Sequence, residues 1–234
     1  MRVALVTGGS KGLGLALARE LAGRGWTLVL DARGGEDLAR AAAELRTVTD
    51  VLAVSGDVAD PAHRRELAGV VAELGRLDLL VNNASVLGPS PLPGLADLPL
   101  PELERVLAVN VVAPLALVQL VLPALVRDGG RLVNISSDAA VEAYPGWGGY
   151  GASKAALDQL TNVLGAEHPT LRCYAVDPGD MRTDLHQSAY PGEDISDRPE
   201  PATVVPALMR LVDGDLPSGR YRAAELAAVE LVGR

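Results

Sequence analysis

Short apolar runs alternate with longer stretches of helical periodicity along the whole chain. The runs lie near residues 2–7, 27–31, 51–54, 78–81, 130–136, 171–176 and 219–222. Each has the length of a buried strand, and helical stretches separate them. This alternation predicts βαβ units with right-handed crossovers, and therefore a parallel sheet with helices on both faces. The sequence thus predicts a doubly wound, Rossmann-like α/β fold with a seven-stranded sheet.

One of the helical stretches, Val111 to Val126, is almost continuously apolar. Its sixteen residues are fewer than the roughly 20 that a bilayer requires, and Pro114, Gln119 and Pro123 weaken a membrane interpretation further. A helix that is apolar all round is buried on both sides. We therefore expect one face to meet the sheet and the other to meet a second subunit, in a homodimer or homotetramer.

The segment from Pro178 to Pro201 departs from the alternation. It is rich in Pro, Asp and Gly and has no sustained periodicity. A stretch of this length inside a compact domain is typically a functional lid or a disordered segment. We expect a lid over the substrate, lined by Met181, His186 and Tyr190. Tyr144 and Trp147 are candidates for the opposite wall, with loop packing as the alternative.

Composition and charge narrow the class of protein. At 234 residues the chain has the length of one domain, taken here as 1–234. Its 21 basic and 30 acidic side chains give a net charge of −9, which would repel nucleic acid. Cys173 is the only cysteine, so no internal disulfide forms. His63, His168 and His186 lack ligand spacing, so we expect no metal site.

A glycine turn opens the chain between a buried strand pattern and a helical run. The strand pattern ends at Thr7, Gly8, Gly12 and Gly14 follow, and the helical run begins at Leu15. Glycine allows a tight turn and a close approach of backbone N–H groups to a pyrophosphate, whose charge the helix dipole also meets. The Gly-x-x-x-Gly-x-Gly spacing differs from the usual dinucleotide motif, so alone it is compatible with a plain loop. The strand begins at residue 2, which leaves no room for a signal peptide and predicts a cytoplasmic protein.

A second group of residues points to acid/base chemistry. Tyr150 and Lys154 are four residues apart, which places them on one helix face. A neighbouring ammonium favours the phenolate, so we expect the pKa of Tyr150 to be lowered towards neutrality. Ser137 follows the strand pattern of 130–136 and so projects at the carboxyl edge of the sheet, where ligands bind. An isolated Tyr-x-x-x-Lys is a short motif, but together with Ser137 and the glycine turn it indicates a carbonyl/alcohol redox site.

With these motifs in order, the chain resembles the short-chain dehydrogenase/reductase family over about residues 2 to 222. The resemblance implies strand order 3-2-1-4-5-6-7, and a catalytic set of Ser137, Tyr150, Lys154 and Asn110, the last organising a water that relays protons to Lys154. Ser85 replaces the usual Gly and Tyr174 replaces an Asn, and we expect neither departure to touch the chemistry. The implied cofactor contacts are Gly8, Ser10, Lys11, Gly12, Leu13, Gly14, Arg33, Asp57, Val58, Asn83, Ala84, Tyr150, Lys154, Pro178, Gly179 and Thr183.

The function that follows is reversible hydride transfer between NADP(H) and a small ketone or aldehyde and its alcohol. NADP is expected because Ala32 stands where NAD-dependent members carry Asp, while Arg33 and Lys11 can meet a 2′-phosphate. If Asp31 is the aligned residue, it would hold the ribose hydroxyls and favour NAD instead. A non-catalytic dinucleotide sensor is the alternative function, but it would not need the Ser/Tyr/Lys set. Nucleotide-sugar epimerases share Tyr-x-x-x-Lys, yet they resemble longer chains with a larger C-terminal substrate domain.

Overall fold

The computed structural model describes residues 1–228, and the strands of that part of the chain form one seven-stranded sheet. All neighbouring strands are parallel, in the order β3-β2-β1-β4-β5-β6-β7. Both the seven-stranded sheet and its strand order confirm the sequence prediction. The strands are β1 (Val3–Thr7), β2 (Thr27–Ala32), β3 (Val51–Ser55), β4 (Leu79–Asn82), β5 (Arg131–Ile135), β6 (Arg172–Asp177) and β7 (Gly219–Arg222).

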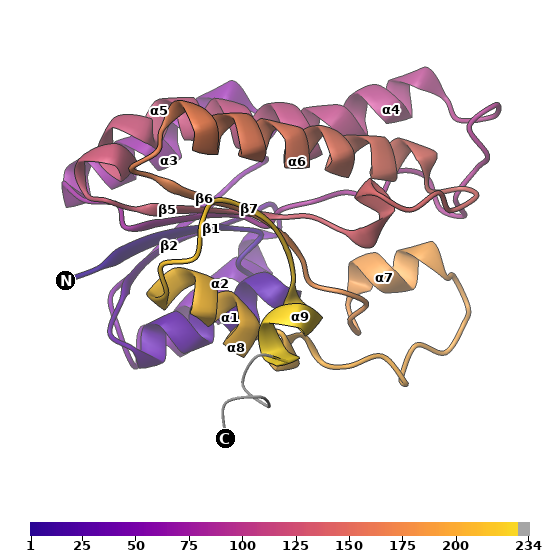
Figure 1. Ribbon diagram of the computed structural model, residues 1–234. Coiled ribbons are helices and arrows are strands. Elements are labelled where there is room, and N and C mark those ends of the chain that lie inside the picture. The colour runs from indigo at the N-terminus through magenta and orange to yellow at the C-terminus, as the bar shows by residue number, and fades with distance from the viewer. Residues whose placement is uncertain (229–234) are drawn as a thin grey trace.

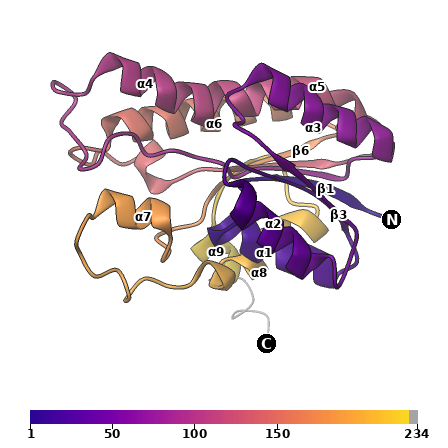
Figure 2. The same cartoon turned by 180° about the vertical axis from the view of Figure 1, so that it is seen from behind.

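Helices cover both faces of the sheet (Figures 1 and 2). One layer holds α3, α4, α5 and α6, and the opposite layer holds α1, α2, α8 and α9. The α-helices are α1 (Gly12–Gly23), α2 (Gly35–Leu45), α3 (Pro61–Leu74), α4 (Leu100–Leu107), α5 (Ala113–Arg127), α6 (Gly148–Glu167), α7 (Asp184–Ala189), α8 (Val205–Asp213) and α9 (Ala223–Ala228). A π-helix, η1 (Ala108–Val112), and two 3-10 turns, η2 (Asp138–Ala140) and η3 (Pro201–Thr203), complete the list.

Alternation along β1 shows how the sheet divides the core. Ala4 and Val6 belong to the cluster shared with α1, α2 and α8, whereas Val3 and Leu5 belong to the cluster shared with α3 and α5. Successive side chains of a strand point to opposite faces. Because both faces are covered by helices, both sets must be apolar, and this produces the continuous apolar runs seen in the sequence.

The apolar segment at 111–126 is part of a longer helical stretch. Leu100–Asp128 is continuous through α4, η1 and α5, and its 29 residues contain a window of mean hydropathy 2.2, long and apolar enough to cross a membrane by composition. The length argument from the sequence was therefore wrong, because the helix is longer than the apolar run. Its apolar character instead reflects the fold, since Leu117, Val121 and Leu125 are buried in the core beneath α5.

Candidate active site

A cavity of about 460 Å³ lies at the carboxyl ends of the strands. Its size is that of a pocket for a small molecule or cofactor. The cavity brings together Ser137, Tyr150, Lys154 and every cofactor residue predicted from the sequence except Gly14. Asn110, predicted as catalytic, is also absent from its walls. The wall further contains Asp31, Ala32, Gly34, Gly56, Ser85, Val86, Asp138, Trp147, Met181 and His186.

The glycine turn fits a dinucleotide. Gly8 and Gly12 have φ of 65° and 56°, a left-handed conformation that glycine adopts without strain. A Cβ at Gly14 would lie 2.3 Å from the Gly8 carbonyl oxygen and 2.6 Å from Asn83 Nδ2. Gly14 is therefore a packing residue, which explains why it does not line the cavity. Next to the cavity, α1 begins at Gly12, so its N-terminal N–H groups and dipole can hold a pyrophosphate there.

Hydrogen bonds between side chains and backbone groups fix several of the remaining cofactor candidates. Asn83 Nδ2 donates to the carbonyl oxygens of Thr7 and Gly8, at 2.9 and 3.1 Å, which ties β4 to the glycine turn. Asp57 accepts from the Ala59 N–H at 2.9 Å. Thr183 caps α7 by accepting from His186 N–H, and its methyl carbon lies 3.5 Å from the position of a Cβ on Gly12. These bonds hold three separate loops around one cavity.

Ser137 and Tyr150 are brought together by a close approach of η2 to α6. A Cβ on Gly151 would lie 2.5 Å from the Ala139 carbonyl oxygen, so the glycine after Tyr150 is required for this contact. Ser137 is extended, with φ −163°, and its hydroxyl lies between Asp138 Oδ1 at 3.0 Å and the Ala139 N–H at 3.2 Å. Both Ser137 and Tyr150 line the cavity. The pair therefore faces the cavity as one hydroxyl cluster.

The environment of Tyr150 differs from the sequence expectation. Its side chain is 6% exposed, and burial raises the pKa of the phenol well above its usual value, while the nearby hydroxyls of Ser85 and Ser137 offset only part of that rise. Lys154 Nζ lies 5.4 Å from the Tyr150 ring centroid. The prediction of a lowered pKa was wrong for the free enzyme, because desolvation of the buried phenol raises its pKa. The phenol of Tyr150 is therefore protonated at neutral pH.

Lys154 is one of the most buried charged groups of the protein. It is 2% exposed, and Nζ donates to the Ile135 carbonyl oxygen at 2.7 Å. Burial lowers the pKa of Lys154 to about 8, and the nearby carboxylate of Asp158 opposes that shift. The amine is thus largely charged at neutral pH and titrates just above it.

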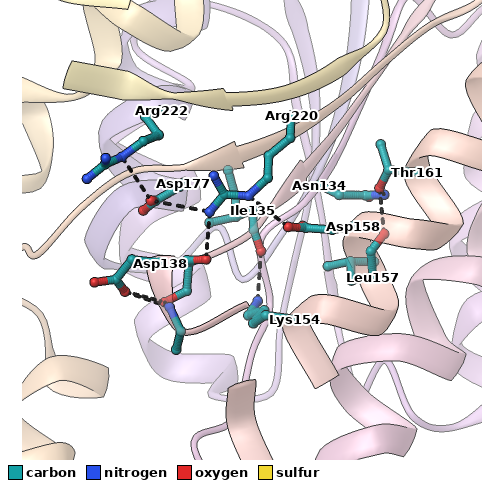
Figure 3. A network of polar contacts seen from close by, with 12 residues as sticks. Asn134, Ile135, Asp138, Lys154, Leu157, Asp158, Thr161, Asp177, Arg220 and Arg222 are labelled. Atoms are coloured by element: carbon teal, nitrogen blue, oxygen red, sulfur yellow. Dashed lines mark hydrogen bonds and ion pairs between the residues drawn. The ribbon is translucent and has the colours of Figure 1, made fainter. Parts of the chain in front are cut away.

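An ionic network behind Lys154 and Ser137 was not foreseen from the sequence (Figure 3). Arg220 on β7 donates to Asp158 Oδ2 at 2.9 Å and to the backbone oxygen of Ser137 at 3.0 Å. It also lies 3.5 Å from Asp177, at the end of β6. Asp158 is one helical turn after Lys154 on α6. One guanidinium on β7 therefore joins α6, the loop that carries Ser137 and the end of β6.

Ser85 touches the site that its sequence departure was not expected to affect. Its hydroxyl donates to Asn110 Oδ1 at 3.2 Å, and it lies close enough to Tyr150 to offset part of the rise in the pKa of the phenol. A hydroxyl at this position therefore bears on the protonation of Tyr150. The available sequence signal was a serine directly after Asn83 and Ala84, in a loop that already carries cofactor candidates.

The side chain of Asn110 is fully occupied by partners. Oδ1 accepts from the Val86 N–H at 2.9 Å and from Ser85, while Nδ2 donates to Val86 O at 2.8 Å and to Ser153 Oγ at 3.0 Å. An amide offers two donors and about two acceptor sites. Its side chain therefore fixes the loop after β4 to α6, and any water that it organises must use the backbone carbonyl in the π-helical turn.

The predicted lid contains a short helix, α7, and contributes part of the cavity wall. Met181 and His186 line the cavity, whereas Tyr190 does not. Tyr190 instead packs on His186 and Trp147, with ring centroids 5.0 and 6.3 Å apart. Trp147 also lines the cavity and meets Tyr150 edge to face at 5.8 Å. Aromatic rings from the lid and from the residue before α6 thus pack together beside Tyr150.

The residues that bear on cofactor choice also differ from expectation. Arg33 is exposed and lines the cavity at the end of β2. Lys11, expected to help bind a 2′-phosphate, forms an ion pair with Asp184 of α7. Asp31 lines the cavity as well, but its carboxylate lies 2.5 Å from His63 Nε2. No group of three or more His, Cys, Asp or Glu side chains within residues 1–228 is placed to hold a metal ion.

Comparison with known proteins connects this geometry to a family. The profile of the family described as short chain dehydrogenase matches residues 2–194. Short chain dehydrogenase asqE of Emericella nidulans is 38% identical over 183 residues, which cover 72% of this chain and 65% of that protein, just under two thirds of its length. The 2-(R)-hydroxypropyl-CoM dehydrogenase of Xanthobacter autotrophicus is 38% identical over 80% of this chain and 77% of its own. The structure of an alcohol dehydrogenase from the archaeon Thermococcus sibiricus, complexed with 5-hydroxy-NADP, superposes with a TM-score of 0.86 at 28% identity, covering 95% of both chains.

Proposed function

The chain belongs to the short-chain dehydrogenase family, and from that premise we propose that Ser137, Tyr150 and Lys154 carry its catalysis. The enzyme is an NAD(P)-dependent oxidoreductase that interconverts a carbonyl compound and an alcohol. The observation that carries the proposal is the meeting of these three side chains at the wall of one cavity that also contains the glycine turn.

Each of the three residues has a separate role at the substrate oxygen. A bound nicotinamide supplies or accepts the hydride. In the reducing direction, the protonated phenol of Tyr150 gives its proton to the oxygen that gains negative charge. Ser137 donates a hydrogen bond to the same oxygen and holds it against Tyr150. Lys154 supplies positive charge beneath the phenol, which stabilises the phenolate left after proton transfer.

A panel of ketones, aldehydes and secondary alcohols, scored by NADPH consumption or formation, tests this function. Aromatic carbonyl compounds are expected to be among the better substrates, because Trp147, which meets Tyr150 edge to face, and His186 both line the cavity. The absence of turnover with every carbonyl class would favour the alternative of a dinucleotide sensor. Binding of NADPH without turnover would then be the expected companion result.

NADP is the cofactor, and NAD is the alternative that the site must discriminate against. Replacing Arg33 with Ala should lower kcat/KM for NADPH by about 10- to 100-fold, the effect of removing a charge-assisted, bidentate phosphate contact. The value for NADH should change by less than about threefold, because NADH lacks the 2′-phosphate. Steady-state kinetics with both cofactors are the measurement. An enzyme that prefers NADH and is indifferent to Arg33 would overturn the assignment.

We infer a homodimer or homotetramer built on the face of η1, α5 and α6. Val112, Leu120, Val126 and Val163 are large apolar side chains exposed on these helices, and a two-fold axis would bury the same patch on both subunits. Sedimentation at micromolar concentration should give a mass above 24.3 kDa. Leu120→Asp should weaken the assembly, whereas Val48→Asp, at an exposed apolar residue elsewhere, should not. A clean monomer in the wild type contradicts the inference.

We further propose that residues 1–234 form one domain and that the protein is cytoplasmic. Residues 229–234 lie outside the described residues. Two large core clusters share the same sheet, so one cooperative calorimetric transition is expected. Two separate transitions would contradict a single domain, and recovery in the membrane fraction would contradict the location.

A further inference from the structure

A buried ion pair lies beneath the part of the cavity formed by the end of β2. Asp31 is 1% exposed and His63 is 5% exposed. Oδ1 of Asp31 is 2.5 Å from His63 Nε2, and the backbone oxygen of Asp31 accepts from the Gly9 N–H at 2.8 Å. The carboxylate therefore sits between the glycine turn and α3, with an imidazole as its side-chain partner.

The surrounding sequence makes room for this contact. Asp60 caps α3 by accepting from the Ala62 N–H at 2.8 Å, with Pro61 in the first turn, and this fixes where His63 projects. A Cβ on Gly56 would lie 2.3 Å from His63 Nδ1. Any other residue at position 56 would displace the imidazole, so the loop after β3 is built to admit it.

The neighbours of His63 favour its protonated form, whereas burial raises the pKa of Asp31. The hydrogen bond with Asp31 is the largest cause that raises the pKa of His63, and Glu66 and Asp60 add to it. Asp57, whose side chain also lines the cavity, faces Asp31 from the loop after β3. The contact occupies Oδ1 of Asp31, and a protonated imidazole at this distance offsets the charge of the carboxylate.

We propose that His63 determines the cofactor preference by sequestering Asp31, so that this acid does not oppose the attraction of Arg33 for a phosphate on the adenosine ribose. An acidic side chain at the end of the second strand otherwise binds the ribose hydroxyls and disfavours a 2′-phosphate. Here the acid is present, but the imidazole of α3 holds it. The proposal rests on the proposed use of NADP and names a specificity residue outside the cavity wall.

Binding of the adenosine halves of the two cofactors tests this without any turnover. 2′,5′-ADP carries the phosphate that distinguishes NADP, and 5′-AMP lacks it. By titration calorimetry, His63→Ala should lower the affinity for 2′,5′-ADP by about tenfold, as expected for one uncompensated charge a few ångströms away. The affinity for 5′-AMP should change by less than about twofold. Asp31→Asn/His63→Ala should restore 2′,5′-ADP affinity to within about threefold of the wild type.

Two controls separate this effect from general damage. Glu66→Gln removes a mostly exposed acid 3.9 Å from the other imidazole nitrogen and should leave both affinities within about twofold. If His63→Ala does not fold, Asp31→Asn decides alone, and its 2′,5′-ADP affinity should stay within about threefold of the wild type. A gain of more than about tenfold in Asp31→Asn would show that Asp31 repels the phosphate despite His63, and this would overturn the proposal.

The remaining outcomes are distinct from failure of the proposed function. Unchanged 2′,5′-ADP affinity in His63→Ala, or equal losses for both ligands, overturns the role of His63 while the use of NADP stands. A wild type that binds 5′-AMP more tightly than 2′,5′-ADP overturns the use of NADP itself, and the proposal with it.

Discussion

Replacing Tyr150 with Phe is expected to lower kcat by a factor of about 10²–10⁴, the usual contribution of a general acid or base. Phe preserves the ring that meets Trp147 edge to face at 5.8 Å, so the packing of α6 should survive. The substitution removes only the hydroxyl of a buried side chain. The affinity for NADPH should therefore remain close to that of the wild type.

Steady-state turnover on the best substrate, paired with a fluorescence titration of NADPH, measures both quantities. Tyr144→Phe is the matched control, because Tyr144 lies on the same approach to α6 and its exposed hydroxyl donates to Asp138 at 3.0 Å. We expect a change of less than about threefold there. If Tyr150→Phe keeps more than about a tenth of the wild-type kcat, the proton donor has been misassigned.

Replacing Lys154 with Met should affect both turnover and cofactor binding. Loss of the buried charge should lower kcat by at least about 10²-fold, because the phenolate then has no cation beneath it. If Lys154 also binds the nicotinamide ribose, as the family resemblance implies, NADPH affinity should fall by about tenfold, the value of one charge-assisted hydrogen bond. Tyr150→Phe and Lys154→Met are thus distinguished by binding as well as by rate.

The pH dependence gives this prediction a second readout. Burial lowers the pKa of Lys154 to about 8, so its charge is present below that value and is lost as the pH rises through it. NADPH affinity of the wild type should fall in the same range, and Lys154→Met should show no such step. Asp158→Asn removes the carboxylate that opposes the shift, so the step should move to lower pH. A step that persists in Lys154→Met would contradict the assignment.

The sheet could be predicted from the sequence because its physical signal is local. A strand covered on both faces must be apolar at every position, as β1 is from Val3 to Val6, and a run of that kind is visible without any knowledge of its neighbours. The order of the strands was not local information. It came from the family resemblance, and the parallel ladders confirm it.

The site was predicted less completely, because several of its contacts join residues far apart in the chain. Arg220 is 62 residues from Asp158 and 83 from Ser137, and His63 is 32 from Asp31; no periodicity signals such pairs. The protonation of Tyr150 depends on desolvation, which a sequence does not report. Ser85 was misjudged because its effect depends on where the Tyr150 hydroxyl lies.

The position of Arg220 on β7 has a consequence for the order in which the enzyme is made. A ribosome completes the glycine turn, Ser137 and the catalytic helix well before it adds β7, the edge strand that carries this guanidinium. Until β7 joins β6, Asp158 and Asp177 lack Arg220, the cation that they share. The loop that carries Ser137 also lacks the hydrogen bond that Arg220 donates to its backbone. A nascent chain can therefore hold every side chain of the proposed catalytic set and still have an unfinished active site, which is completed only when β7 has been synthesised.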